Sequence, residues 1–306
     1  MTTEALVAPR SRELLARFTG GRALPIAVVL LTILLVWYGG TVLLNAPQQI
    51  DQFERDGVSW TAVDLVVATM DMERPVLPSP HQVAVEMKQS IFDLRPTSKR
   101  SLVYHSWVTL SSTLLGFAIG ALIGVVLAAG IVHVPTLEKS LMPWVISSQT
   151  IPILAIAPMI VVVLGAVGLK GLVPKAIIST YLCFFPVTIG MVKGLRSPDT
   201  LQMDLMRTYS ATRWQTFRLL RWPASIPFLF ASLKVAVAIS LVGAIVGELP
   251  TGAQAGLGSR LLAGSYYGQT VQIWAALLTA AVIAAVMVTL VGLAERAVGR
   301  AMGGRP

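Results

Sequence analysis

The residue types that most often perform chemistry are few and scattered in this sequence. Its three histidines, His81, His105 and His133, lie in separate loops or at the ends of apolar runs. Neither the HExxH pattern of zinc hydrolases nor the GxSxG pattern of serine hydrolases occurs. A catalytic site needs a nucleophile with a base, or a set of metal ligands, in one place. The sequence therefore predicts a non-catalytic protein.

The sequence also lacks a nucleotide-binding loop. Its glycine-lysine segment, GAVGLKGLVPK at residues 165–175, has neither the spacing nor the Gly-Lys-Ser/Thr ending of a phosphate-binding loop. We therefore expect no ATP to bind to this chain by that motif.

Two ionisable residues, Lys234 and Glu248, lie in or at the end of one apolar run. Such groups are costly at membrane depth and are usually functional. For Lys234 we favour a side chain that extends to the nearer interface. Glu248 fits a solute contact and a solvated boundary position equally well. A carrier driven by protons or sodium ions usually has more carboxylates at mid-membrane, so we expect any driving energy to come from outside this chain.

These residues are embedded in a very apolar chain. Of its 306 residues, 55% are hydrophobic and 13% are charged, whereas soluble domains carry about 25% charged residues. We therefore predict an all-α integral membrane protein. The net charge of +9 fits positive-inside topology better than nucleic-acid binding, because no basic patch is interleaved with aromatic residues. The single cysteine, Cys183, is expected to be a small buried hydrophobic residue.

The first third of the chain divides into three predicted parts. A cytoplasmic segment, residues 1–23, precedes a first transmembrane helix at 24–44, which is long enough to cross about 30 Å of hydrocarbon. No small-residue cleavage site follows, so we expect a retained helix rather than a signal peptide. In the extracytoplasmic segment, residues 45–101, the stretch VLPSPHQVAVEM predicts a short amphipathic helix, with Ser79 as its cap and Pro80 at its first position.

The remaining spans form a predicted membrane core, residues 102–295, followed by a cytoplasmic tail, residues 296–306. We expect five spans here, at residues 106–132, 141–165, 172–192, 226–248 and 271–293. Gly116, Gly120 and Gly124 repeat at four-residue spacing, which predicts close helix packing. Prolines interrupt the second and third of these spans, as in helices that are kinked or that line a pathway.

Six spans that begin in the cytoplasm place the termini and two loops inside the cell. These inside segments hold fourteen of the twenty-four basic residues, as the positive-inside rule requires. They are Arg10, Arg12, Arg17, Arg22, Lys139, Lys193, Arg196, Arg207, Arg213, Arg218, Arg221, Arg296, Arg300 and Arg305.

The longer inner loop, residues 193–227, is too long for a simple connection. A helix that begins near Ala211 would place Trp214, Phe217 and two arginines on one face. Aromatic residues and arginine dominate protein interfaces, so we favour a docking helix. An interfacial anchor helix is the alternative. Pro223 is expected to end or kink this element.

The loop resembles the cytoplasmic EAA loop of ABC importer permeases. That pattern has an acid, two small residues, a glycine four positions later, an aromatic residue and Leu-Pro. The matching positions here are Asp204, Leu205, Met206, Ser210, Ala211, Phe217 and Trp222-Pro223. Serine replaces the glycine at Ser210. If that position requires a left-handed backbone, serine is strained there; alternatively, Ser210 caps the docking helix.

Other segments are similar to the nitrate, sulfonate and taurine branch of these permeases. They are TRWQTF at 212–217, LPSP at 77–80, TIP followed by AIAP at 150–158, and AGLG at 255–258.

The resemblance implies a type I ABC importer permease fold with about six transmembrane helices and a cytoplasmic coupling helix. It implies a homodimer or a pair with a close paralogue, two ATPase subunits that hold ATP and Mg²⁺, and an extracytoplasmic solute-binding protein. This chain would bind no cofactor or nucleic acid and would lie among lipids of the bacterial inner membrane, with both termini cytoplasmic. The implied ATPase-docking residues are Asp204, Ser210, Ala211, Arg213, Trp214, Phe217, Arg221 and Pro223. The predicted pathway residues are Gln149, Pro152, Lys234 and Glu248.

The solute is less clearly specified by the sequence. Permeases of this branch carry nitrate, sulfonates, taurine, bicarbonate or heterocycles. The outer segment, residues 247–269, holds a single basic residue, Arg260, which favours a neutral or heterocyclic solute. Two alternatives to an ATP-driven importer are an ion-coupled secondary transporter or channel, and a membrane scaffold.

Overall fold

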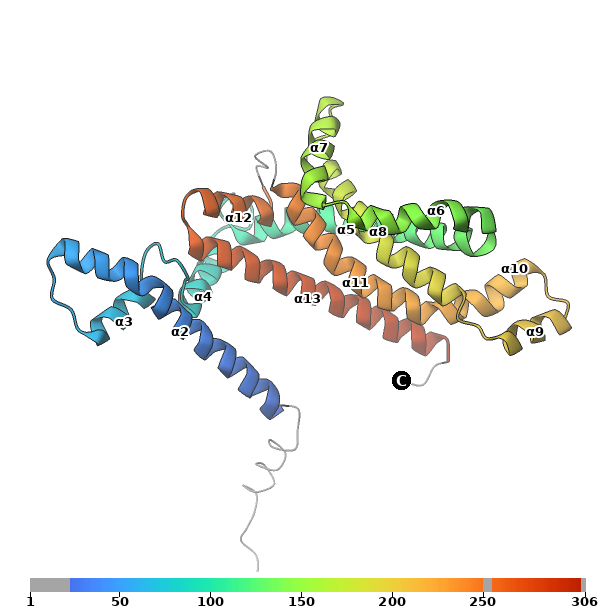
Figure 1. Ribbon diagram of the computed structural model, residues 1–306, viewed down its shortest axis with the longest axis horizontal. Coiled ribbons are helices and arrows are strands. Elements are labelled where there is room, and N and C mark those ends of the chain that lie inside the picture. Colours follow the sequence, from blue (N-terminus) through green and yellow to red (C-terminus); the bar gives the residue numbers. More distant parts are fainter. Residues whose placement is uncertain (1–22, 250–254, 304–306) are drawn as a thin grey trace, which may run out of the picture. The chain divides into compact units, whose positions relative to one another are not determined.

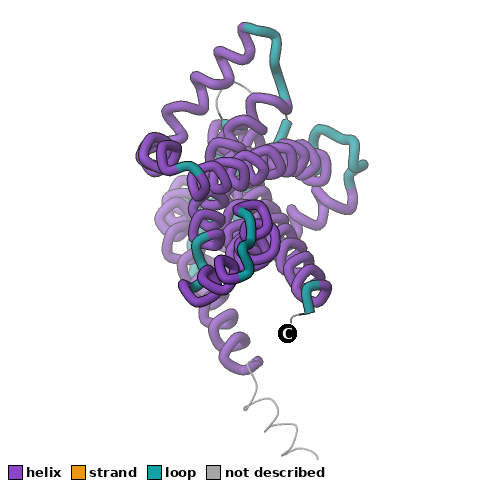
Figure 2. Tube along the Cα trace, turned by 90° about the vertical axis from the view of Figure 1, so that its right-hand side faces the viewer, coloured by secondary structure: helices purple, strands orange, loops and turns teal. Residues whose placement is uncertain are grey.

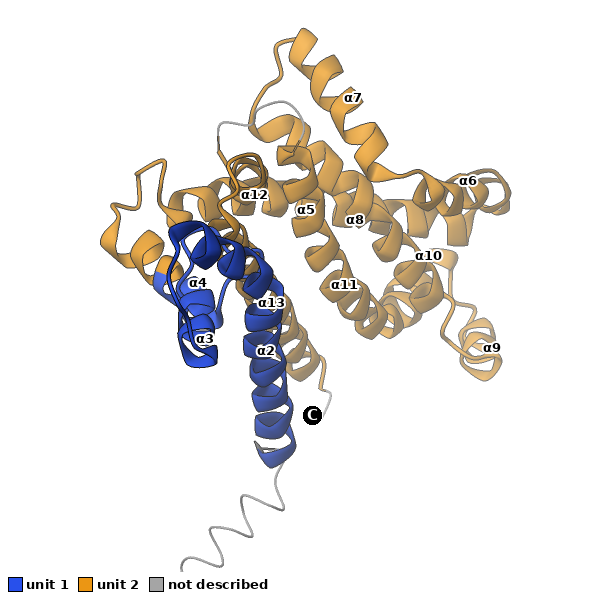
Figure 3. Ribbon diagram, turned by 60° about the vertical axis from the view of Figure 1, so that its left-hand side comes forward, with its two compact units in different colours: residues 1–85 blue, residues 86–306 orange. Residues whose placement is uncertain are grey.

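All regular structure in the described part of the chain is helical. The computed structural model describes residues 23–249 and 255–303 (Figures 1 and 2). The chain forms two compact units, residues 1–85 and 86–306 (Figure 3). The N-terminal segment as far as Arg22, together with Arg305 in the tail, lies outside the described residues.

The first unit is built around one long helix. Helix α2 (Ala23–Asp56) contains the predicted first span but continues past Leu44, with Pro47 inside it. Helix α3 (Ala62–Met70) packs against α2 and begins with a capping box, in which the Thr61 hydroxyl accepts from the Asp64 amide and the Asp64 carboxylate accepts from the Thr61 amide. Thus α2 is longer than the bilayer core requires, and its last turns carry the polar residues of the segment that follows the predicted span.

A buried asparagine holds the turn after α3. Asn45 is fully buried, and its Nδ2 donates to the carbonyls of Thr69 (3.1 Å) and Leu77 (2.9 Å). Its Oδ1 accepts from the amides of Val76 (2.8 Å) and Leu77 (3.1 Å). The side chain thus meets four backbone groups, which satisfies both its donors and both its acceptor sites.

Helix α4 (Pro80–Lys88) confirms the predicted short helix, with Pro80 at its first position. The hydroxyl of Ser79, which we expected to cap this helix, donates to the carbonyl of Met70 at 2.9 Å. The side chain of Gln82 reaches back and accepts from the Ser79 amide at 3.1 Å, which supplies half of a capping box.

The second unit carries the membrane core. In order, its elements after α4 are the π-helical turn η1 (Gln89–Asp93), α5 (Leu102–His133), α6 (Pro135–Ser147), the 3-10 turn η2 (Ser148–Thr150), α7 (Ile153–Ala166), α8 (Leu172–Leu195), α9 (Thr200–Thr208), α10 (Arg213–Thr216), the π-helical turn η3 (Phe217–Arg221), α11 (Trp222–Glu248), α12 (Leu257–Tyr266) and α13 (Thr270–Ala301).

Within the described residues, five helices are long and apolar enough to cross a membrane, and a bent pair raises the number to six. The five are Leu24–Asp56, Leu102–His133, Leu172–Leu195, Arg213–Glu248 and Thr270–Ala301. The bent pair joins Pro135–Thr150 to Ile153–Ala166 at an angle of 101°. The break falls at Pro152, one of the prolines from which the sequence predicts an interruption.

Small residues bring α5 and α8 into close contact, which confirms the predicted close packing of the α5 glycine repeat and identifies α8 as its partner. A Cβ atom added to Gly116 would lie 2.3 Å from the Cβ of Ser179, and one added to Gly120 would lie 2.9 Å from the Cβ of Cys183. Gly124 continues this stripe. Cys183 is fully buried in this core, as the sequence predicts. Helix α11 packs against the same two helices, so α5, α8 and α11 form the centre of the second unit.

Candidate functional site

Two groups of residues in the second unit have geometry that suggests a function. The first is the docking segment, residues 199–223, at one end of the helix bundle (Figure 1). Helix α9 begins with a capping box, in which the Asp199 carboxylate accepts from the Gln202 amide at 2.7 Å. Asp204 lies on the exposed side of α9 and pairs with Arg207 at 2.9 Å. Ion pairs this exposed contribute little to stability, so these charges remain available to a partner.

Ser210 stands in the position that usually requires glycine. The amide of Ala211 donates to the carbonyl of Met206 (2.9 Å), and the amide of Ser210 donates to the carbonyl of Arg207 (2.8 Å). This pair of bonds is the Schellman motif, which ends a helix with one left-handed residue. Ser210 is that residue, with φ of 50°. Ser210 therefore has the left-handed backbone that we considered from the sequence, and a serine side chain is strained in that conformation.

The docking helix is capped by Thr212, not by Ser210. The Thr212 hydroxyl accepts from the Gln215 amide (3.2 Å), and the Gln215 side chain accepts from the Thr212 amide (2.8 Å). The helix then begins at Arg213, two residues after the predicted start at Ala211. The alternative role of Ser210 as the cap is thus wrong, because Thr212 has the extended backbone that a cap needs.

The docking helix does not end at Pro223 but continues into α11. Between them, η3 makes a π-helical turn, in which the Trp222 amide donates to the carbonyl of Phe217. Pro223 lies in the first turn of α11 and has no amide hydrogen to donate. The π turn provides the continuous connection, and Pro223 removes only one bond from the helix.

The two aromatic residues of the docking helix, Trp214 and Phe217, differ in burial. Phe217 is half-buried against the central core, and its ring lies 5.1 Å from the ring of His133 and 6.0 Å from that of Trp222. Trp214 stacks on Phe217 at 5.6 Å but remains 66% exposed. Phe217 therefore anchors the helix tip, while Trp214 presents an aromatic surface.

Of the predicted docking residues, four are exposed and four are half-buried. The exposed ones are Asp204, Ser210, Arg213 and Trp214, and the half-buried ones are Ala211, Phe217, Arg221 and Pro223. The neighbouring apolar residues Leu201, Leu205 and Tyr209 are also exposed. They extend the surface beyond the residues that the sequence pattern identified.

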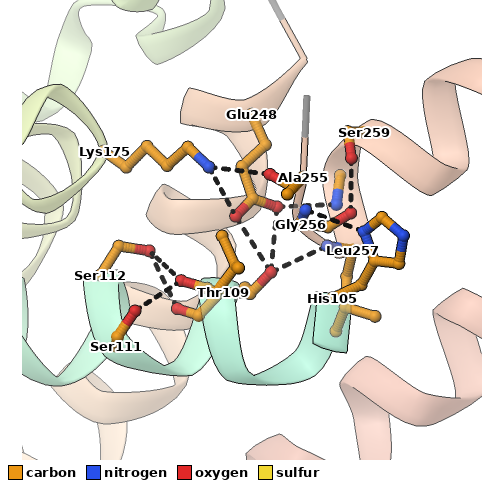
Figure 4. Close-up of polar contacts among 12 residues, drawn as sticks. His105, Thr109, Ser111, Ser112, Lys175, Glu248, Ala255, Gly256, Leu257 and Ser259 are labelled. Carbon is orange, nitrogen blue, oxygen red and sulfur yellow. Dashed lines mark hydrogen bonds and ion pairs between the residues drawn. The ribbon is translucent and has the colours of Figure 1, made fainter. Parts of the chain in front are cut away.

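The second group is a buried polar network at the opposite end of the bundle (Figure 4). Glu248, at the end of α11, has no exposed surface. Its carboxylate accepts from Lys175 Nζ (3.3 Å), Thr109 Oγ1 (3.0 Å) and the Gly258 amide (2.8 Å). Lys175 also donates to the carbonyl of Ala255 at 2.9 Å. The network thus joins α5, α8 and α11 to the first turn of α12.

Two glycines make room for this carboxylate. Gly256 has φ of 129°, which side chains rarely adopt, and an added Cβ would lie 2.2 Å from Glu248 Oε1. At Gly258 an added Cβ would lie 2.4 Å from the carbonyl of Ile245. The AGLG segment therefore has glycine where Glu248 and the α11 backbone approach most closely.

His105 completes the network as a neutral side chain. Its Nδ1 accepts from the Gly256 amide at 3.0 Å, and its Nε2 lies 2.9 Å from the carbonyl of Lys99. These two contacts require a proton on Nε2 only. The Leu257 amide donates to Thr109 Oγ1 at 2.8 Å. Three consecutive amides, from Gly256 to Gly258, are therefore fixed by side chains of α5 and α11.

Comparison with known proteins identifies the family. Residues 120–304, more than half of the chain, match the family model described as binding-protein-dependent transport system inner membrane component. The chain belongs to this family of ABC importer permeases. It is therefore a type I ABC importer permease in fold, a membrane transport component with several apolar helices.

Individual permeases are similar over most of the chain. The riboflavin transport system permease protein RibX of Chloroflexus aurantiacus is 31% identical over 95% of this chain and 94% of its own length. The formylaminopyrimidine transport permease protein ThiX of Halalkalibacterium halodurans is 31% identical over 60% of this chain and 68% of its own. A putative aliphatic sulfonates permease, SsuC of Bacillus subtilis, is 25% identical over 72% of this chain and 76% of its own.

The four predicted pathway residues of this permease lie in three different settings. Gln149 and Pro152 are exposed at the break between α6 and α7. Lys234 is half-buried and pairs with Glu295 of α13. Glu248 belongs to the buried network. No hydrogen bond or ion pair among the described residues joins any two of these four.

Sequence reasoning missed Lys175 and Glu295, the partners of the two charges that it singled out. Lys175 is the third residue after Leu172, where the apolar run begins, and Glu295 lies just past the predicted end of the last span. An opposite charge at the same end of a neighbouring span was the signal that could have identified each pair.

Proposed function

We propose that this permease lines the translocation pathway of an ATP-driven importer and that its docking segment transmits ATPase closure to the spans. The observation that carries this proposal is the docking segment itself. Its helix tip presents Trp214 and Arg213 to solvent, yet it is continuous with span α11 through η3. A force applied to the tip by a partner would therefore reach α11 along one helix.

The proposed assembly has two permease subunits, two ATPase subunits that bind ATP and Mg²⁺, and an external solute-binding protein. The second permease is a copy of this chain or a close paralogue. Both termini and the docking segment lie in the cytoplasm of the bacterial cell, an orientation supported by the arginines of the inner segments.

For the solute we favour a nitrogen heterocycle over a sulfonate, taurine or nitrate. RibX and ThiX, whose names specify riboflavin and formylaminopyrimidine, are each 31% identical. SsuC and the nitrate permease NrtB of a Synechocystis strain are 25% identical.

Co-purification of the ATPase tests the docking role. Trp214→Asp should reduce the co-purified ATPase at least about tenfold, because an exposed aromatic residue at an interface centre commonly contributes more than 1.4 kcal/mol. Tyr267→Asp is the matched control, since Tyr267 is 71% exposed but lies between α12 and α13. Phe217 is unsuitable for this test because it packs against the core.

Equal ATPase recovery with both variants would refute the docking role. Uptake that continues without an ATPase and follows an ion gradient would instead support an ion-coupled secondary transporter or channel.

A further inference from the structure

A large cavity lies beside the buried network, at the end of the bundle opposite the docking segment. Its volume is about 790 Å³, which is within the range of sites for drug-sized ligands. Tyr104, Trp107 and Ser111 of α5 line one side, and Val161 and Val162 of α7 line another. The loop before α8 contributes Lys170. The walls are therefore mostly apolar, with two aromatic rings on the same face of one helix.

Three polar groups among the described residues of this cavity are free to bind a ligand. The Tyr104 hydroxyl and Trp107 Nε1 form no hydrogen bond with another described residue. The ammonium group of Lys170 has no carboxylate of the described residues within 4.0 Å. Trp107 is 69% exposed. An exposed indole and phenol beside one ammonium group supply flat apolar surface and a few donors.

The second lysine that lines the cavity does not add a net charge. Lys175 is paired with Glu248 and also donates to the Ala255 carbonyl. Among the described residues that line the cavity, one cation, Lys170, is thus unpaired, and there is no cationic cluster. Sulfonate and nitrate groups are best held by several donors at once, so this wall suits them poorly.

We propose that this cavity binds the solute and that its ligand class is a flat, uncharged aromatic heterocycle with carbonyl acceptors. One ring face of the ligand stacks on Trp107, and Tyr104 contacts an edge of the ligand. Lys170 donates a hydrogen bond to a carbonyl oxygen of the ligand. This inference rests on the proposed function, and it adds the position of the site and the residues that recognise the solute.

Riboflavin is a suitable probe, because its ring system is flat, uncharged and fluorescent. The full-length protein, reconstituted in phosphatidylcholine nanodiscs, is titrated against riboflavin, and flavin fluorescence anisotropy reports binding. We expect saturable binding that Trp107→Ala weakens about tenfold, because stacking on an aromatic side chain contributes this much to the binding of a base. Trp107→Phe retains a ring and should restore most of the affinity.

Trp144→Ala is the matched control, since Trp144 is 77% exposed on α6 and does not line the cavity. It should leave riboflavin affinity unchanged. Lys170→Gln should weaken binding roughly threefold through the loss of a charged donor. Taurine and nitrate in large excess should not displace the probe.

Absence of riboflavin binding, equal effects of Trp107→Ala and Trp144→Ala, or displacement by taurine or nitrate would each overturn the inference. ATPase co-purification separates this result from the proposed function. If the ATPase is recovered but riboflavin binding does not depend on Trp107, the proposed solute site is wrong and the proposed importer function is supported. If riboflavin binding depends on Trp107 but no ATPase co-purifies, the proposed solute site is supported and the proposed importer function is wrong.

Discussion

Ser210 holds a backbone conformation that serine rarely adopts, at the turn that joins α9 to the docking helix. Its φ of 50° closes a Schellman motif, and the related EAA pattern has glycine at this position. A side chain in the left-handed region costs about 1 kcal/mol that glycine avoids. The docking segment therefore has a strained residue at the turn between α9 and α10.

Ser210→Gly should raise the stability of the folded protein by about 1 kcal/mol, because glycine has no Cβ to clash in the left-handed turn. The midpoint of thermal denaturation in detergent is the measurement. Ser265→Gly is the control, since Ser265 is an exposed residue inside α12. Ser265→Gly should lower the denaturation midpoint. If Ser210→Gly also lowers it, the backbone at Ser210 is not strained.

Lys175 and Glu248 should depend on each other for stability. Glu248→Gln leaves an unpaired ammonium in a buried site, which should destabilise the protein by about 3–5 kcal/mol. Lys175→Met alone should also destabilise. The double variant Lys175→Met with Glu248→Gln should lose less than the sum of the single changes, since no unpaired charge remains. Additive losses in the denaturation midpoint would show that the two side chains are not coupled.

At the scale of elements, close packing of α5 against α8 depends on residues without side chains. Gly116→Ala should reduce stability by about 1–3 kcal/mol, because its Cβ would overlap Ser179 and the Ala176 carbonyl. Gly299→Ala in α13 is the control, since an added Cβ meets nothing within 4 Å. That change should be neutral or slightly stabilising. Equal effects on the denaturation midpoint would argue against tight packing.

The elements also show what could be predicted from the sequence. The glycine repeat predicted close packing on one face of α5, because spacing along a helix fixes which residues share a face, but it did not indicate that α8 is the partner. The prolines predicted an interruption in the second core span, which occurs at Pro152, since proline removes a backbone bond. They did not indicate which proline breaks a helix, because Pro143 and Pro158 lie inside helices and Pro186 lies inside the continuous α8. The π turn at η3 was not foreseen, because an extra residue in a turn leaves no mark in hydrophobic periodicity. Asn45 and Lys175 were missed because their partners lie far away in the sequence, where no local pattern reveals them.

At the scale of the whole molecule, membrane orientation can be measured with single cysteines. Cys183 has no exposed surface, so the parent protein should react little with an impermeant maleimide. Tyr209 and Tyr267 are 78% and 71% exposed and are separated by span α11 and the outer α12. Tyr267→Cys should be labelled in cells whose inner membrane is intact, and Tyr209→Cys only after that membrane is opened. The reverse pattern would invert the proposed topology.

Because η3 is a π-helical turn, the direction in which the docking surface faces depends on the number of residues in that turn. A π turn holds one more residue between bonded groups than an α turn. Deleting any one residue from Phe217 to Arg221 could restore regular α-helical bonding, and it would rotate everything before the deletion by about 100° relative to α11. Trp214 would then face another direction, although almost every residue of the surface was retained. Homologous permeases that keep this docking geometry should accordingly tolerate substitutions in η3 far better than insertions or deletions.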